Sequence, residues 1–525
     1  MSRSDRFLGC LMGLAVGDAL GYPIEGWTQE QIQARYGPVR DYVEPPTEPP
    51  EKWRLPGLHS DDTQQALVVA DTLIEAGRAD PDVLCQKFLD LAEGPPHLIL
   101  GAHRGAGRNF RYTIQALREG ASWNHGSRHT AGVGATMRVA PVGLAFGLDD
   151  AAVRSNAALQ ALVTHNDPRA VAASCVVAHS IGRLAWFHPE PLHPEPFLEE
   201  EIHFLRRSED WLLEAHGRHL ARDSRPVLHH MSEALAGIAG QTSRSPEDVL
   251  PGIATRASDL AGYMIEHPCR GFAPAGIVSA IYFFLHFRGE FEVALEEAIR
   301  WGGDTDTVGA VVGALCGAYQ GIRAIPARWT DRLRGRDLVL SRARALLGDR
   351  QAMAAMPDLA EVELEWTLEE DRIRREKTGE PPIDHSAWVR RVVVRQIPPR
   401  ERDEDRYEES GGYGDRDRDR DRDRDRDRRD RDRGRGHDRG RDRERVHERE
   451  RERVYEREPG PERESGAERQ PGPEPGQSDF AYEAPPGERE ERFRGGVGSG
   501  GSSGGGGRGG RRRRRPGGRG GGGRG

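Results

Sequence analysis

The spacing of hydrophobic residues predicts helices along most of the first 347 residues. Residues 66–74 show this best, because apolar side chains recur there at the three- and four-residue intervals of one helix face. Further stretches with helical character lie at 6–20, 82–91, 101–117, 169–174, 227–239, 273–287, 291–301, 308–318 and 327–347. Almost no stretch before residue 350 alternates between apolar and polar positions, as a half-buried strand would. We therefore expect an all-α fold.

Two segments depart from this helical pattern. Residues 187–225 are more charged and repeat Pro-Glu pairs, so we expect an insertion in the helical domain, which would span 1–347. Residues 348–400 give mixed signals, since 362–366 alternates like a strand and 388–394 is rich in β-branched residues. We expect a small appendage there, in which these two stretches pair as strands.

The composition changes abruptly near residue 400. Asp-Arg repeats run from 415 to about 433, a Glu/Arg-rich stretch follows, and the end is Gly/Arg-rich with five consecutive arginines at 511–515. Alternating charges without an apolar face cannot bury a core, so we expect residues 401–525 to form a disordered tail. The Gly/Arg end is suited to nucleic acid or another polyphosphate, with a merely solubilising tail as the alternative. The net charge of −8 is a small difference between 77 basic and 85 acidic residues, so it indicates no partner.

Cysteine usage points to a reducing compartment. The five cysteines are scattered, odd in number and without C-x-x-C spacing, which argues against a disulfide framework or a zinc site. The apolar stretch 7–16 has acidic residues on both sides, so we interpret it as a buried helix and not as a signal peptide. We expect a cytoplasmic monomer with no membrane partner.

Two predicted helices begin with doubled carboxylates. One start is Ser60-Asp61-Asp62, and the other is Gly302-Gly303-Asp304-Thr305-Asp306-Thr307. A helix cap needs one such side chain, and adjacent carboxylates repel each other. Carboxylate and hydroxyl oxygens suit a hard cation such as Mg2+ or Mn2+. One start alone is explained equally well as a cap, but two starts in one domain favour a shared metal site.

Other motifs carry weaker signals. Glu25 lies in a loop bounded by glycine and proline, and His165 directly precedes a predicted helix start at Asp167-Pro168. Both are most simply ordinary loop residues. The pair Gly132-Val133-Gly134 precedes an apolar stretch and could cradle a phosphate, but no strand precedes it, which excludes a Rossmann motif.

Together these motifs resemble the ADP-ribosylglycohydrolase family, which includes dinitrogenase reductase-activating glycohydrolase and eukaryotic ADP-ribosyl hydrolases. The matching pieces are Gly17-Asp18-Ala19-Leu20-Gly21 with Glu25, Ser60-Asp61-Asp62-Thr63, residues 132–141, Thr164-His165 and residues 302–307. Their order and rough spacing also match, and the resemblance covers residues 5–345.

The resemblance implies an orthogonal all-α bundle that holds two divalent cations, Mg2+ or Mn2+. The implied metal ligands are Ser60, Asp61, Asp62, Asp304, Asp306 and Thr307. The implied catalytic carboxylates are Glu25, Asp61 and Asp304. The implied contacts to ADP-ribose are Gly132, Gly134, Ala135, Thr136 and His165.

The implied activity is hydrolysis at the anomeric carbon, which would release ADP-ribose from a modified protein side chain or a related conjugate. The alternative is a catalytically weak ADP-ribose-binding or structural homologue, tethered by its tail to nucleic acid or poly(ADP-ribose). The complete ligand set favours the enzyme. Two positions depart from the family pattern: Val133 replaces a common asparagine, which puts the substrate in doubt, and Ser60 replaces a frequent threonine with the hydroxyl kept.

Overall fold

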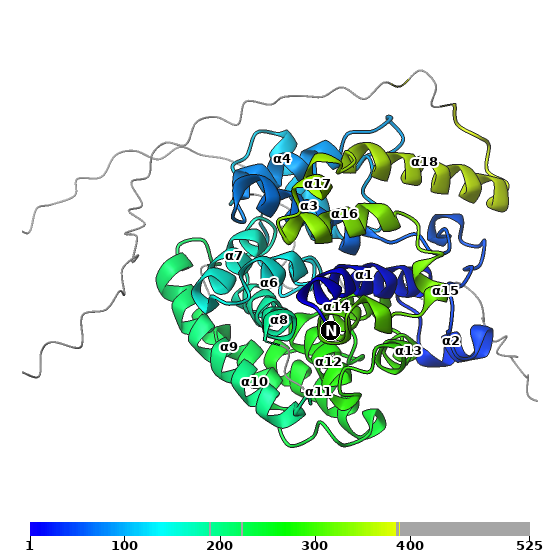
Figure 1. Cartoon of the computed structure of the whole chain (residues 1–525). Coiled ribbons are helices and arrows are strands. Elements are labelled where there is room, and N and C mark those ends of the chain that lie inside the picture. The colour runs from blue at the N-terminus through cyan, green and yellow to red at the C-terminus, as the bar shows by residue number, and fades with distance from the viewer. Residues whose placement is uncertain (126, 188–190, 222–223, 385–387, 389–525) are drawn as a thin grey trace, which may run out of the picture. The chain divides into compact units, whose positions relative to one another are not determined.

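The apolar stretch at 6–20 forms α1, which lies at the centre of the helical assembly beside α14 (Figure 1). The computed structural model describes residues 1–125, 127–187, 191–221, 224–384 and 388. Within these residues all regular elements are helices, so the all-α prediction is confirmed.

The helices of the first half are α1 Arg3–Gly21, α2 Gln29–Tyr36, α3 Asp61–Ala76, α4 Pro81–Leu91, α5 Arg108–Arg118, α6 Ala140–Phe146, α7 Asp150–Leu162, α8 Pro168–Trp186 and α9 Pro194–His216. Those of the second half are α10 His230–Ala236, α11 Pro246–Ala261, α12 Ala273–His286, α13 Phe291–Trp301, α14 Thr305–Gln320, α15 Ala327–Thr330, α16 Arg336–Leu346, α17 Arg350–Ala354 and α18 Leu359–Thr378. Most predicted helical stretches fall on one of them.

Glycines on α1 and α14 bring these two helices into backbone contact. A Cβ added to Gly13 would lie 2.1 Å from the carbonyl oxygen of Gly313, and one added to Gly17 would lie 2.0 Å from that of Gly309. No real Cβ tolerates such distances, so only glycine fits at these crossings. The pairing is antiparallel, and it therefore sets the end of α1 against the beginning of α14.

Other helices pack around this central pair. α3 and α16 contact α1 and each other, and α8, α12 and α13 contact α14. In Figure 1, α3, α4, α16, α17 and α18 lie on one side of α1, with α8 to α12 on the other. α3 also contacts α14.

The expectation of a strand at 362–366 is wrong. This stretch lies inside α18, whose buried residues recur at helical spacing. Four of the seven buried positions on that face are polar, namely Glu363, Thr367, Glu370 and Asp371. The spacing of hydrophobic residues therefore did not predict the helix. Most of 388–394 lies outside the described residues, as does the tail at 401–525.

Two further expectations are refined by the structure. The single helix expected at 327–347 is divided into α15 and α16 by Gly335, whose φ of 76° is left-handed. The segment 187–225 contains α9, which packs against α8 and α10. That this segment is an insertion stays a prediction.

By length and composition alone, Arg3–Ile24 is the one helix among the described residues that could cross a membrane. Of its apolar window, 94% is buried inside the protein. Such burial is typical of the core helix of a globular domain.

Candidate metal centre

The end of α1 is fastened to the start of α14 at the residues that flank Glu25. The Thr305 hydroxyl donates to the carbonyl of Gly21 at 2.8 Å, and the Gly26 N–H donates to the carbonyl of Gly303 at 2.7 Å. A Cβ on Gly21 would lie 2.2 Å from the carbonyl oxygen of Thr305. Glu25 is therefore held beside the start of α14 by main-chain contacts.

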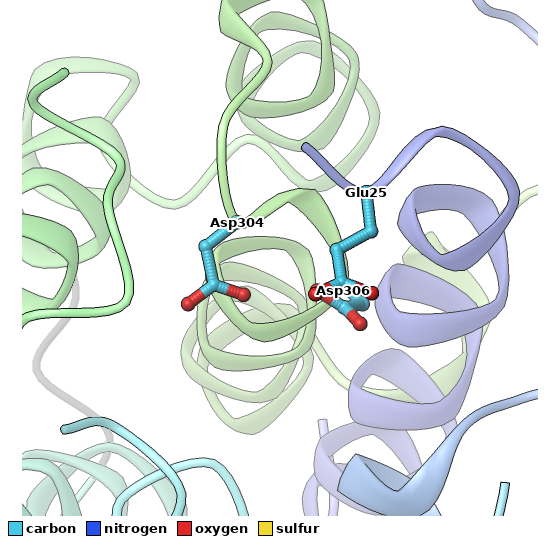
Figure 2. A group of neighbouring side chains, drawn as sticks. All are labelled: Glu25, Asp304 and Asp306. Carbon is cyan, nitrogen blue, oxygen red and sulfur yellow. The ribbon is translucent and has the colours of Figure 1, made fainter. Parts of the chain in front are cut away.

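Three carboxylates converge there. Each of Glu25, Asp304 and Asp306 offers an oxygen within 4.8 Å of the other two. Figure 2 shows Glu25 arriving from the segment after α1 and the two aspartates from the beginning of α14. Glu25 is exposed, Asp304 is half-buried and Asp306 is buried, so the cluster reaches from solvent into the protein.

The other predicted ligands form the start of α3. Ser60 is the N-cap, and its hydroxyl accepts from the Asp62 N–H at 3.1 Å. The Ser60 hydroxyl also lies 3.2 Å from Oδ2 of Asp62, to which it can donate. Buried Asp18 of α1 accepts from the N–H of Ser60 at 2.9 Å and from the hydroxyl of Thr63 at 2.6 Å. Asp18 thus fixes this helix start.

The two helix starts face a common space. Burial raises the pKa of Asp306 well above its ordinary value, and the negative charges of Glu25, Asp62 and Asp304 raise it further. Burial likewise raises the pKa of Asp62 well above its ordinary value, with Asp61 and Asp304 among the neighbours that add to it. Carboxylates from both starts therefore repel one another across this space.

The donor set fits a hard divalent cation. Oδ1 of Asp62 is buried and has no hydrogen-bond partner among the described residues. An unpaired buried carboxylate oxygen is costly unless something binds it. Oxygen donors are those that Mg2+ and Mn2+ prefer, and bound positive charge would offset the repulsion within the cluster. The roles of the individual ligands stay predictions.

Asp61 is linked to a buried arginine. Its Oδ2 accepts from Nε2 of Gln65 at 2.6 Å, and Oε1 of Gln65 accepts from Nη1 of Arg138 at 2.6 Å. The other guanidinium nitrogens donate to Gln160 at 2.8 Å and to the hydroxyl of Thr164 at 2.9 Å. Burial lowers the pKa of Arg138 to about 9. The arginine therefore connects the start of α3 to the loop that carries the predicted substrate residues.

His165 lies against the glycine pair. Its ring Nε2 would be 3.3 Å from a Cβ on Gly132, and its Cε1 would be 3.3 Å from a Cβ on Gly134. Nδ1 lies 2.8 Å from the hydroxyl of Thr164. Burial lowers the pKa of His165 to about 3, so its ring is neutral near pH 7. The structure thus brings together three of the five predicted ADP-ribose contacts.

The other two predicted contacts, Ala135 and Thr136, turn into the core. Ala135 is fully buried, and its carbonyl accepts from Gln160 at 3.0 Å. The hydroxyl of Thr136 lies 3.2 Å from that of Ser174 in the neighbouring helix α8. Their contact with ADP-ribose stays a prediction.

Sequence reasoning did not assign roles to Asp18, Gln65 and Arg138. Each is buried with at most 1% of its surface exposed. Asp18 carried a usable signal, because a carboxylate inside an apolar helix needs buried partners. The sequence gives no sign that Gln65 and Arg138, 73 residues apart, form a hydrogen bond.

Comparison with known proteins shows which family the chain is similar to. A family model described as ADP-ribosylglycohydrolase matches residues 1–355. An uncharacterized protein of Archaeoglobus fulgidus is 31% identical over 342 residues, which are 64% of this chain and 93% of that protein. The ADP-ribosyl-[dinitrogen reductase] glycohydrolase of Rhodospirillum rubrum is 28% identical over 334 residues, covering 63% and 90% of the two chains. A solved structure, an ADP-ribosylglycohydrolase-related protein complex, is 28% identical with a TM-score of 0.47, covering 66% and 98%.

Proposed function

The chain belongs to the ADP-ribosylglycohydrolase family, and on that premise we propose that it is a metal-dependent hydrolase of ADP-ribose conjugates. The proposed reaction cleaves the bond at the anomeric carbon and releases ADP-ribose from a modified protein side chain or a related conjugate. The observation that carries the proposal is the convergence of Glu25, Asp304 and Asp306 within 4.8 Å. The relative from Rhodospirillum rubrum, named for the same kind of reaction, supports it.

We assign two divalent cations, Mg2+ or Mn2+, to the space between the two helix starts. The residues that would hold them are Ser60, Asp61, Asp62, Asp304, Asp306 and Thr307. Bound there, the cations would supply positive charge that orients the ribose hydroxyls and increases the acidity of a water. The unpaired Oδ1 of Asp62 supports this assignment.

The carboxylates of the chain itself would do the remaining chemistry. Glu25 is the exposed member of the cluster, so we assign to it the contact with an incoming conjugate, where it would position the substrate or take part in catalysis. Asp61 or Asp304 would accept the proton of the attacking water. Cleavage at an anomeric carbon develops positive charge on the sugar, which buried carboxylates stabilise.

Recognition of ADP-ribose would fall to His165 and the glycine pair beside it. The close approach of the ring to Gly132 and Gly134 leaves little room for side chains at these two positions. Val133 is 7% exposed and packs into the core. It offers no amide where the family commonly has one, so the choice of linkage rests on other residues.

The alternative function is that of a catalytically weak homologue that binds ADP-ribose. The number of carboxylates in the cluster opposes it, because their mutual repulsion raises the electrostatic cost of the fold unless a cation offsets it. Activity and binding separate the two candidates directly.

The test uses the full-length protein with Mg2+ and peptides that carry ADP-ribose on arginine or on serine. Release of free ADP-ribose is measured for the wild type, for Asp306→Ala and for Asp259→Ala, an exposed aspartate on α11 that serves as the control. We expect turnover of one linkage by the wild type and the control, and none by Asp306→Ala. A rise in melting temperature with ADP-ribose but no release from any linkage would favour the binding protein.

A further inference from the structure

Helix α18 starts at Leu359, beyond the last residue matched by the family model, yet it reaches the back of the candidate metal centre. Its N-cap Asp358 accepts from the N–H of Glu361 at 2.9 Å, so the helix has a defined N-terminal cap. One turn further along, Glu363 is fully buried. A carboxylate in such a place needs several partners.

Glu363 finds three partners, and two of them lie in one short segment. Oε1 lies 2.9 Å from Nε2 of His59, and Oε2 accepts from Nε2 of Gln64 at 2.9 Å. Oε2 also accepts from Nη2 of Arg104 at 2.6 Å. His59 and Gln64 bracket residues 60–62, the first half of the predicted ligand set.

Arg104 strengthens the same attachment. Its Nε donates to the carbonyl of His59 at 2.9 Å, and its main-chain N–H donates to Oε1 of Gln64 at 3.0 Å. Its Nη1 donates to the hydroxyl of Thr367, one turn after Glu363, at 2.9 Å. The ion pair and its hydrogen bonds therefore hold both ends of the segment that carries the ligands.

Asp18 holds this segment from the opposite side, through the N–H groups of Ser60 and Thr63. The start of α3 is thus clamped between α1, inside the family match, and α18, outside it. Oxygen ligands bind a cation well only when their main chain is fixed, and outer partners of ligands usually provide that fixation.

We propose that Glu363 is a positioning residue of the metal centre and that α18 belongs to the catalytic unit. Glu363 acts through His59 and Gln64, which fix the main chain of residues 60–62 for cation binding. This inference rests on the proposed function, because it assumes that those residues hold a cation.

The test measures Mn2+ binding to the metal-free, full-length protein, with free Mn2+ followed by electron paramagnetic resonance. We expect Glu363→Gln to bind Mn2+ at least about tenfold more weakly than the wild type. Glu365→Gln, an exposed glutamate two residues away on the same helix, should stay within about twofold. Urea unfolding of each metal-free variant is recorded in parallel, because a purely structural role would lower stability without changing Mn2+ affinity.

Glu363→Asp guards against a variant that fails to fold, since it keeps the charge opposite Arg104 but shortens its reach. It should also weaken Mn2+ binding. Unchanged Mn2+ affinity in folded Glu363 variants would overturn the inference, and so would unfolding of both variants, which would assign the residue to folding alone. Wild-type protein without Mn2+ binding, or Asp306→Ala that binds like the wild type, would instead refute the proposed metal centre itself.

Discussion

Gly13 of α1 lies so close to Gly313 of α14 that a Cβ on Gly13 would stand 2.1 Å from the Gly313 carbonyl oxygen. Two helix backbones in direct contact leave no side chain that could move aside. The contact sets the register in which the end of α1 meets the start of α14. The position of Glu25 beside Asp304 depends on that register.

Gly13→Ala should therefore destabilise the protein by about 1–3 kcal/mol or more, because the added methyl group forces the helices apart. Urea unfolding measures the change. Gly252→Ala is the matched control, since Gly252 is an exposed glycine inside α11 with nothing within 4 Å of an added Cβ. It should gain roughly 0.5–1 kcal/mol. Equal effects of the two variants would contradict the close contact.

Asp306→Ala should abolish release of ADP-ribose and at the same time stabilise the metal-free protein. The pKa of Asp306 is raised by burial and by Glu25, Asp62 and Asp304, so the native state gains when this carboxylate is removed. We expect roughly 0.5–2 kcal/mol, measured by urea unfolding in a chelating buffer. A less stable variant would show that the aspartate serves as a structural cap.

Arg138→Met should weaken ligand binding by displacing residues of the site, although Arg138 itself does not contact the carboxylate cluster. The variant removes the donors to Gln65 and Thr164, so Asp61 and His165 lose their common support. We expect a loss of about 1–3 kcal/mol in stability, because buried acceptors on Gln65 and Gln160 lose their donor, and a weaker affinity for ADP-ribose. Calorimetric titration and urea unfolding test both. Arg256→Met, on the exposed face of α11, is the control.

Stability should fall as the pH decreases from about 6.5 to 4. Burial lowers the pKa of His103 to about 4, so between these values the unfolded chain binds a proton that the folded chain does not. The stability that neutral His103 contributes to the folded state is fully present above pH 6.5 and is lost as the pH falls toward 4. His103→Gln keeps a donor toward the Phe88 carbonyl and should flatten the decline by roughly 1–3 kcal/mol. The exposed His203→Gln should leave the slope unchanged.

Deletion of residues 401–525 should leave turnover of a small peptide conjugate nearly intact. The clustered site residues and their supports all lie before residue 379. A longer deletion, of residues 359–525, should reduce turnover sharply, because it removes α18 and with it Glu363. Initial rates at saturating Mg2+ compare the two truncations. Loss of activity in the shorter deletion would place the tail in the catalytic unit.

The sequence by itself determined the fold class and predicted which residues form the site. Helical spacing predicted most helices because each buries one apolar stripe, and doubled carboxylates at two helix starts are unusual enough to indicate a cation. The same spacing rule did not predict α18, because the buried face of this helix carries the polar residues Glu363, Thr367 and Glu370. Hydrophobicity along the sequence therefore did not indicate which positions are buried. Local patterns identify an element only when its buried face is apolar.

Only the tertiary structure decided which groups meet. Gly13 and Gly313 lie 300 residues apart, and no local sequence pattern predicts that their backbones are in contact. The same holds for Gln65 with Arg138 and for His59 with Glu363, whose bonds depend on packing between distant helices. The residue types set what the site can bind, while the packing of α1, α14 and α18 sets where its oxygens lie.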